Sequence, residues 1–384
     1  MKARWPALLL ILAAACGGGS PHTLSSTSPS PGGQGGTGTG PTPSSGPLPT
    51  SLPRVVLTAD LSERPAPWRL IAHIPFGHQA SSLGVVLPPE HTSVPEIPVS
   101  FAVAPDGTLW VLDVVKERIA HFTSAGRYLG EVGGLSFDRF SPHPRDIAFV
   151  GERLYLLQSD EPIQAQERAL VLPVDTSGGP PPALPGQPVF DGSNPLLIQY
   201  LMAGVPDLEG RSFGYALADA FSSGRHGWVG LDGTGPYATH PLDSIAVGSG
   251  RRMFLARVGD RDFRLLFVGP EGSAVQPIHF TLVTGRGTAD RALPAAFGLE
   301  PDVVVRGGLA AFMMVSPTRP GDAGKYGGGR WFLEVKDDGS PIIFERLPDR
   351  GLSDESIGRN ITVGADGSIY LMVAEEGGMN FYRR

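Results

Sequence analysis

One stretch, residues 101–133, constrains the fold of this 384-residue chain more than any other. It reads FAVAPDGTLWVLDVVKERIAHFTSAGRYLGEVG, and its short, alternating apolar runs are separated by turn-forming residues. Asp106-Gly107 between two such runs is typical of a β-hairpin, and we expect a type I′ turn there, because both central residues of that turn need φ > 0. The pattern predicts four antiparallel strands, at residues 99–104, 108–114, 118–123 and 128–133. A sheet of this size cannot bury its apolar faces alone, so it needs similar units to pack against.

The same pattern of an apolar strand, a glycine-containing turn and a strand with a central aromatic residue recurs along the chain. Residues 361–373, ITVGADGSIYLMV, align without a gap to FAVAPDGTLWVLD, which places Tyr370 at the position of Trp110. Three looser copies are IAFVGERLYLL at 147–157, IAVGSGRRMFL at 245–255 and VVVRGGLAAFMM at 303–314. Repeats of this length predict sheets stacked linearly or radially, with each aromatic residue packed on the neighbouring unit.

Residues 99–134 resemble an NHL repeat, and the chain from residue 68 onwards resembles a six-bladed β-propeller of that broad class. The resemblance implies an all-β fold of four-stranded antiparallel blades. The strand WRLIAHIPFG at 68–77 has no blade of its own, so we expect it to close the last blade as its outer strand. One blade is assigned by spacing to residues 187–241, where YALADAF at 215–221 is alternatively a helical insert. A linear β-solenoid and a seven-bladed ring are the competing architectures.

The N-terminus has the features of an export signal, which we assign to residues 1–15. Lys2 and Arg4 precede an apolar run at 7–15 that is too short to span a bilayer. The small residues before Cys16, the single cysteine of the chain, resemble a bacterial lipobox. That resemblance implies cleavage before Cys16, lipidation of Cys16, and a place in the cell envelope as an outer-membrane lipoprotein facing the periplasm or the outside. An ordinary cleavable signal with an incidental Cys16 is the alternative.

Residues 16–53 are predicted to be a disordered linker that follows the lipidated cysteine. Of the 37 residues from Gly17 to Pro53, 32 are Gly, Ser, Thr or Pro, and none is charged with His22 neutral. Such a segment cannot bury enough apolar surface to fold, and as a flexible chain it spans about 30–37 Å. Residues 54–384 are predicted to form the β-propeller domain, although the sequence leaves open whether 54–67 pack on it.

The net charge and the cysteine content argue against a nucleic-acid partner and against an internal disulfide. The net charge of −7 and the scattered Lys and Arg residues argue against a nucleic-acid partner. One cysteine allows no internal disulfide, so the core must supply the stability. We expect a monomer that is attached to the membrane only through the lipid on Cys16.

The sequence contains no motif specific for catalysis, such as GxSxG, a Walker loop, HExxH, paired cysteines or an EF-hand loop. The repeats do suggest one candidate binding site, because a polar residue begins the innermost strand of each copy. In a propeller these positions converge at one mouth of the central channel, where their oxygens can bind Ca²⁺ or a small polar ligand. The set is Ser100, Asp146, Asp243, Ser244, Asp302 and Asn360. Turn chemistry accounts for the same residue types, because they hydrogen-bond the local backbone.

Two functions from different classes therefore compete. The first is a membrane-tethered propeller that binds or scaffolds an unidentified protein, peptide or glycan, with no catalytic residue and no cofactor. The second is suggested by lactonase-like six-bladed propellers, which hold a catalytic cation with acidic and Asn side chains in this region. It is a cation-dependent lactonase-like or lyase-like enzyme, with Ca²⁺ as the candidate cofactor. His73 and His78, which flank a strand end, are a minor alternative metal pair.

Overall fold

The structure is a computed structural model that describes only part of the chain. The described residues are 50–87, 95–133, 143–150, 152–159, 169–177, 196–206, 212–220, 225–230, 239–240, 244–248, 251–269, 272–283, 295–302, 308–317, 329–336, 341–348 and 360–384. Within these ranges the chain is mostly β-strand, with no α-helix and with one short 3-10 turn, η2 (Val114–Lys116). No helix in this part of the chain is long and apolar enough to span a membrane.

The described strands form six sheets, which we number in chain order. Sheet 1 contains β4 (Ser100–Val103), β5 (Leu109–Asp113), β6 (Arg118–Phe122) and β7 (Tyr128–Gly133). Sheet 2 contains β8 (His143–Val150), β9 (Arg153–Ser159) and β10 (Ala169–Val174). Sheet 3 contains β11 (Leu196–Pro206), β12 (Ser212–Ala220), β13 (Arg225–Gly230) and β14 (Thr239–His240).

Two of the remaining three sheets include strands from the N-terminal part of the domain. Sheet 4 contains β15 (Ser244–Gly248), β16 (Arg251–Arg257), β17 (Asp262–Gly269) and β18 (Gly272–Val283), with β1 (Thr50–Ser51) and β2 (Val55–Asp60) paired to β18. Sheet 5 contains β19 (Ala295–Asp302), β20 (Gly308–Pro317), β21 (Gly329–Lys336) and β22 (Pro341–Arg346). Sheet 6 contains β23 (Ile361–Val363), β24 (Ile369–Glu375), β25 (Gly378–Arg383) and β3 (Arg69–Pro75).

Sheet 1 confirms the four antiparallel strands predicted from residues 99–133. The observed strand bounds lie within one or two residues of the predicted ones. Trp110 pairs across the strands with Ala102 on one side and with His121 on the other. The Trp110 and His121 rings stack with centroids 3.9 Å apart and an interplanar angle of 15°. Alternating apolar residues therefore set the register of this sheet as expected.

The turn at Asp106-Gly107 differs from the type I′ turn that we expected. Gly107 has φ = 83°, but Asp106 is not among the described residues with positive φ. The Gly107 amide donates to the Ala104 carbonyl oxygen at 2.8 Å, and the Ala104 amide donates to Thr108 O at 2.9 Å. This is the pattern of a type I turn followed by a left-handed glycine. Pro105 explains it, because its ring fixes φ near −65° at the first central position.

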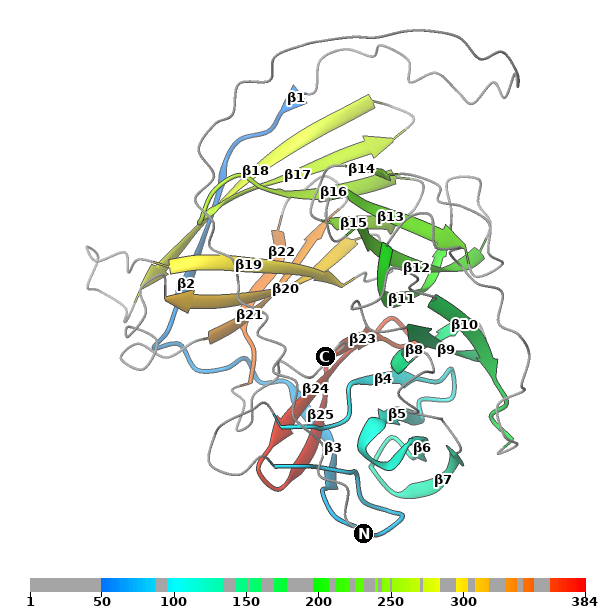
Figure 1. The fold of residues 1–384 in the computed structure, drawn as a ribbon. Helices are drawn as coiled ribbons and strands as arrows, with labels where there is room; N and C mark the ends of the chain where they lie inside the picture. The colour runs from blue at the N-terminus through cyan, green and yellow to red at the C-terminus, as the bar shows by residue number, and fades with distance from the viewer. Residues whose placement is uncertain are drawn as a thin grey trace, which may run out of the picture.

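The first strands of successive sheets lie beside one another. Contacts join β23 to β4, β4 to β8, β8 to β11, β11 to β15, and β15 to β19. Each of these strands is at one end of its sheet, so the later strands extend outward from this row. Figure 1 shows the row facing the middle of the molecule, with the sheets arranged around it. The structure is therefore of the radial, propeller-like kind and not a linear stack.

The core consists of apolar layers between neighbouring sheets. Trp110, which is 4% exposed, packs with Ile147, Leu154 and Leu156 of sheet 2. Its ring also meets Phe149 edge-on at 6.3 Å. This confirms that the central aromatic of the first repeat packs on the next unit, as predicted.

A second layer lies between sheets 6 and 1. Phe101 of sheet 1 meets Phe381 of sheet 6 edge-on at 5.5 Å, and Tyr370, which occupies the Trp110 position in the last repeat, lies in the same cluster. The C-terminal sheet is thus packed directly against the first one. A third layer, between sheets 5 and 6, contains Trp68 against Phe332.

The structure decides two points that the sequence left open. Residues 215–220 belong to the strand β12 and are not a helical insert, because pairing with β11 and β13 on both sides outweighs the helix preference of Ala and Leu. Residues 54–67 pack on the domain, and part of the predicted linker, Thr50–Ser51, already pairs with β18. The N-terminal strand β3 pairs with β25, as the sequence led us to expect.

Replacing Trp110 with Ala is expected to lower the free energy of unfolding by about 3–5 kcal/mol, because it empties the layer between sheets 1 and 2. Chemical denaturation monitored by far-UV circular dichroism measures this loss. The matched control is Leu129→Ala on the outer strand β7, where the side chain is 44% exposed. Equal stability of the Trp110→Ala variant and the wild type would contradict the assignment of this layer.

Candidate functional site at the start of the inner strands

The predicted polar set is only partly brought together by the described residues. Ser100 is the first residue of β4, and Asn360 directly precedes β23, a strand that contacts β4. Asp146 lies within β8, which begins earlier than expected, at His143. Asn360, Ser100 and Asp146 therefore belong to three consecutive inner strands of the row, β23, β4 and β8.

The other members of the set do not extend this group. Ser244 begins β15, as predicted, and Asp243 lies outside the described residues. Asp302 is the last residue of β19 and pairs with Ala310 of β20, so it lies at the end of the inner strand and not at its start. The predicted position of Asp302 is corrected because the inner strand precedes the apolar run at 303–305, which the repeat alignment had taken as the strand. Cys16 also lies outside the described residues.

Ser100 and Asp146 form a buried hydrogen-bonded pair between sheets 1 and 2. Ser100 Oγ donates to Asp146 Oδ1 at 2.5 Å, and both side chains are fully buried. The Ile147 amide donates to Asp146 Oδ1 at 2.8 Å and approaches Ser100 Oγ at 3.3 Å. Burying these polar groups without partners would cost about 1–3 kcal/mol each, so their pairing stabilises the junction of β4 and β8.

Asn360 is the third residue of this group. It is half-buried, and its backbone carbonyl accepts a hydrogen bond of 2.7 Å from the Met372 amide. Its side chain makes no hydrogen bond within the described part of the chain. The same residues contain no group of three or more His, Cys, Asp or Glu side chains arranged to hold a metal ion. Of the minor histidine pair, His73 Nδ1 lies 2.7 Å from Asn380 Oδ1 and is thereby engaged.

A buried ion pair that sequence reasoning missed lies next to these inner strands, at the end of β5. Asp113, whose side chain is fully buried, faces Arg118, with Oδ2 3.2 Å from Nε. The Gly84 amide donates to both carboxylate oxygens, at 3.2 and 3.1 Å. A Cβ at Gly84 would lie 2.6 Å from Val115 Cβ, so only glycine allows this close approach.

The two cations beside Asp113 hold the segment that joins sheet 6 to sheet 1. Arg118 donates to the carbonyl oxygens of Ala80, at 2.8 Å, and of Ser82, and it also pairs with Glu131. Lys116 Nζ donates to the carbonyl oxygens of Gln79 and Ser82, both at 2.7 Å. Positive charge thus satisfies the carbonyl oxygens of Ala80 and Ser82, and it adds to the bonds that Gln79 O accepts from the Ser82 amide and hydroxyl.

Asp113 and Glu131, the two carboxylates that pair with Arg118, have pKa values shifted in opposite directions. Burial raises the pKa of Asp113, and the nearby charge of Arg118 only partly offsets it. Glu131 is less buried, and hydrogen bonds from Tyr128 and Arg118 outweigh its desolvation, so its pKa is lowered. Burial likewise lowers the pKa of Lys116. The arrangement is a structural clamp on residues 79–84, and the sequence between the predicted strands 108–114 and 118–123 gives no signal for it.

Comparison with known families matches one part of the chain. The family described as Domain of unknown function (DUF7485) matches residues 66–134. This span holds β3, the clamped segment and all of sheet 1. The sequence matches none of the curated proteins.

Several solved structures are similar at low identity. They include the PQQ-bound form of aldose sugar dehydrogenase from Streptomyces coelicolor, at 16% identity and a TM-score of 0.42, over 82% of this chain and 96% of that chain. A catalytically inactive virginiamycin B lyase from Staphylococcus aureus with quinupristin matches at 12% identity and a TM-score of 0.35, over 77% and 82%. A luciferin-regenerating enzyme matches at 9% identity and a TM-score of 0.42, over 74% and 90%.

Replacing Asp113 with Ala is expected to reduce the free energy of unfolding by about 3–5 kcal/mol, because it leaves the buried Arg118 charge without its buried partner. Denaturant titration measures the change. The matched control, Glu131→Gln, removes a carboxylate that is 40% exposed and should cost no more than about 1 kcal/mol. Equal losses in the two variants would show that burial does not distinguish these partners of Arg118.

Proposed function

We propose that this chain is a membrane-tethered, six-bladed β-propeller of the cell envelope that binds a protein, peptide or glycan at the inner ends of its blades. Each of the six sheets would be one blade, and β3 would close the last blade at β25. The radial row of inner strands and the apolar layers between neighbouring sheets support this architecture. Such pairing would tie the N-terminal part of the domain to its C-terminal sheet.

The observation that carries the proposal is where the N-terminal segment enters the domain. β1 and β2 pair with β18, the strand of sheet 4 farthest from the inner strand β15. A tether from Cys16 through residues 17–49 would therefore reach the domain at its outer rim. Attachment at this rim would leave the inner strands and Asn360 open to a partner, which suits a domain held at a membrane.

Membrane attachment can be tested on the full chain expressed in a bacterium. Cys16→Ser is expected to move the protein from the membrane fraction to the soluble fraction, because stable anchoring needs the acyl chains. Fractionation and metabolic labelling with a palmitate analogue measure this, and Cys16→Ala should behave in the same way. Unchanged membrane association and labelling in the Cys16→Ser chain would refute lipidation at this residue.

The binding role and the cation-dependent alternative differ in their response to calcium. A binding propeller without a metal site should melt at the same temperature with EDTA and with millimolar Ca²⁺, in the wild type and in Asn360→Ala alike. A calcium-dependent rise in Tm that Asn360→Ala abolishes would favour the lactonase-like or lyase-like reading, because a bound ion stabilises the folded state. Leu129→Arg, on the outer strand β7, is the control for surface effects.

Partner binding itself is tested by affinity capture from envelope fractions. Wild-type protein and the Leu129→Arg control should retain the same partner, and Asn360→Arg should lose it, because the larger charged side chain would fill the proposed site. Retention by all three proteins would place the binding surface away from the inner strands.

A further inference from the structure

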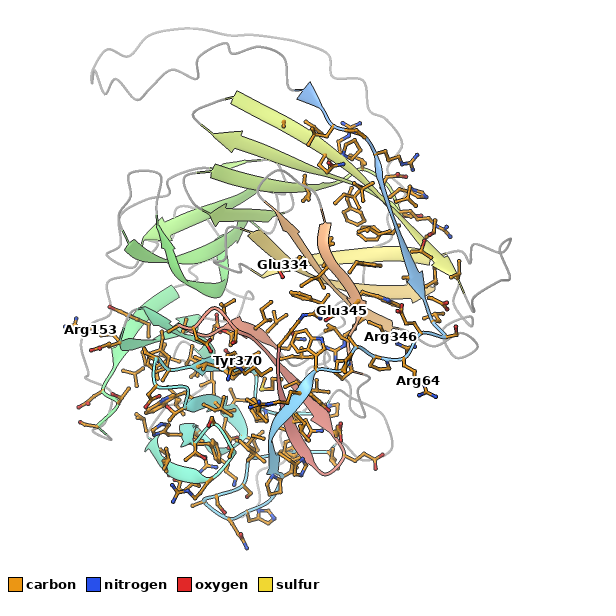
Figure 2. All side chains as sticks on the ribbon, turned by 180° about the vertical axis from the view of Figure 1, so that it is seen from behind. Arg64, Arg153, Glu334, Glu345, Arg346 and Tyr370 are labelled. Carbon is orange, nitrogen blue, oxygen red and sulfur yellow. The ribbon has the colours of Figure 1, made fainter. Side chains whose placement is uncertain are left out.

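The outer edge of sheet 4 carries one strand more than the blade pattern needs. The strands β15 to β18 already make four antiparallel strands, as many as in sheets 1, 3, 5 and 6. Residues 50–60, which we call the arm, add β1 and β2 to β18 in parallel, whereas β17 pairs with β18 antiparallel. Figure 2 shows the arm along this edge, with Arg64 and Arg346 beside the chain that follows it. The arm is therefore an accessory strand on a sheet that is complete without it.

One face of the arm fits apolar side chains of β18. Alternate residues of β2 lie directly opposite three buried apolar residues of β18, in the pairs Val55–Ile278, Leu57–Phe280 and Ala59–Leu282. Leu57 and Ala59 are themselves buried by this pairing. Where a strand is added to a sheet edge, the backbone ladder supplies affinity and alternate side chains supply selectivity. The edge of β18 therefore selects apolar residues at every second position of the arm.

A buried amide side chain binds the arm at the break between β1 and β2. Pro53 lies at this break and has no amide hydrogen to donate to the ladder. Gln276 of β18 is buried, and its Nε2 donates to Pro53 O at 2.6 Å and to Pro277 O at 3.1 Å. A buried donor that loses its acceptor costs about 1–3 kcal/mol. Both the apolar pairs and Gln276 thus favour an edge of β18 that is occupied.

The connection between the arm and β3 is more open than the arm itself. Residues 61–67 are half-buried or exposed, and Trp68, which follows them, is buried. Pro65 and Pro67 favour an extended backbone here, because each fixes its own φ and restricts the residue before it. Seven extended residues span about 25 Å. The arm can therefore leave its own β18 and reach past it while Trp68 and β3 stay in place.

Hydrogen bonds hold this connection in a turn when the arm lies on its own chain. Asp60 Oδ1 accepts from the Ser62 amide at 2.9 Å, and Arg346 Nη1 donates to the carbonyl oxygens of Leu61 and Glu63. Opening of this turn is what an exchange of the arm between chains would cost, because the contacts of the arm with β18 can be remade on another chain.

We propose that the outer edge of β18 is a strand-acceptor site, and that the arm of a second copy of this chain occupies it in a strand-exchanged dimer. The contacts in the dimer are those of the monomer, because both copies have the same arm and the same β18. Within one chain the connection keeps the arm at a high effective concentration, so the monomer is the form expected in dilute solution. Crowding of copies on a membrane would favour the dimer, a consequence that rests on the proposed attachment at Cys16.

Disulfide trapping between two full-length chains tests the exchange without lipid. One chain carries Thr58→Cys and the other Thr281→Cys, both with Cys16→Ser so that no native thiol remains. Thr58 and Thr281 pair directly across β2 and β18, with Oγ1 atoms 2.9 Å apart, so the register allows a disulfide where one arm lies on the other β18. Mixed at about millimolar concentration with oxidised glutathione, the two chains should give a covalent heterodimer on non-reducing electrophoresis.

Two control samples make the result decisive. The double variant Thr58→Cys/Thr281→Cys should close its disulfide within one chain, and failure to close would contradict the pairing on which the proposal rests. Thr58→Cys mixed with Leu129→Cys measures random collisions, because Leu129 is exposed on β7. A heterodimer yield no higher than that of this collision pair would overturn the exchange, whatever the fate of the membrane assignment.

A labelled synthetic peptide of residues 50–62 tests the acceptor site itself. In the full chain, Leu57→Asp should loosen the resident arm, because it buries an unpaired carboxylate opposite Phe280. This variant should therefore bind the peptide more tightly than the wild type does, as measured by fluorescence anisotropy. The matched control is the peptide that carries Leu57→Asp, which should bind neither protein.

Equal binding of the two peptides, or no binding of the native peptide to the Leu57→Asp chain, would overturn the acceptor site. Far-UV circular dichroism checks that the Leu57→Asp chain keeps its sheets. If it does not, the disulfide experiment still decides the proposal, because both of its cysteines replace threonine side chains that face away from the apolar pairs.

Discussion

Face-to-face burial between neighbouring sheets is the constraint on which the structure depends. No sheet of three or four strands can bury both of its apolar faces by itself, so each needs the next one. Trp110 supplies this contact between sheets 1 and 2, and Phe101 with Phe381 supplies it between sheets 6 and 1. Because the last sheet packs on the first, an apolar layer brings together Phe101 and Phe381, which lie 280 positions apart.

Buried polar pairs also stabilise the junctions between sheets. Ser100 and Asp146 satisfy each other where β4 meets β8, and Asp113 with Arg118 fixes the segment between sheets 6 and 1. In each case a buried charge or hydroxyl is paired, since burial without a partner would cost more than the contact gains. Asn360 differs from these groups, because it is half-buried and its side chain has no hydrogen bond within the described region.

Local patterns predicted sheet 1 closely, because alternation sets which face of a strand is buried and short turns set where it ends. They predicted the turn type wrongly, since Pro105 fixes the conformation that Asp106-Gly107 alone would leave open. Repeat alignment also misplaced Asp302, because β19 has no strong alternation of its own and is defined by pairing with β20. The polar residue types of the candidate site could be predicted from the sequence, but the contact between Ser100 and Asp146 could not.

The sequence by itself determined the all-β character, the hairpins of the first and last repeats and the aromatic residue that each of these repeats packs on its neighbour. Those features depend on residues a few positions apart, whose periodicity is visible along the chain. Only the tertiary structure decided that β2 lies parallel to β18, that Arg346 donates to the carbonyl oxygens of Leu61 and Glu63, and that Gly84 approaches Asp113. These partners are separated by many residues, and their meeting follows from how the sheets assemble and not from any local preference.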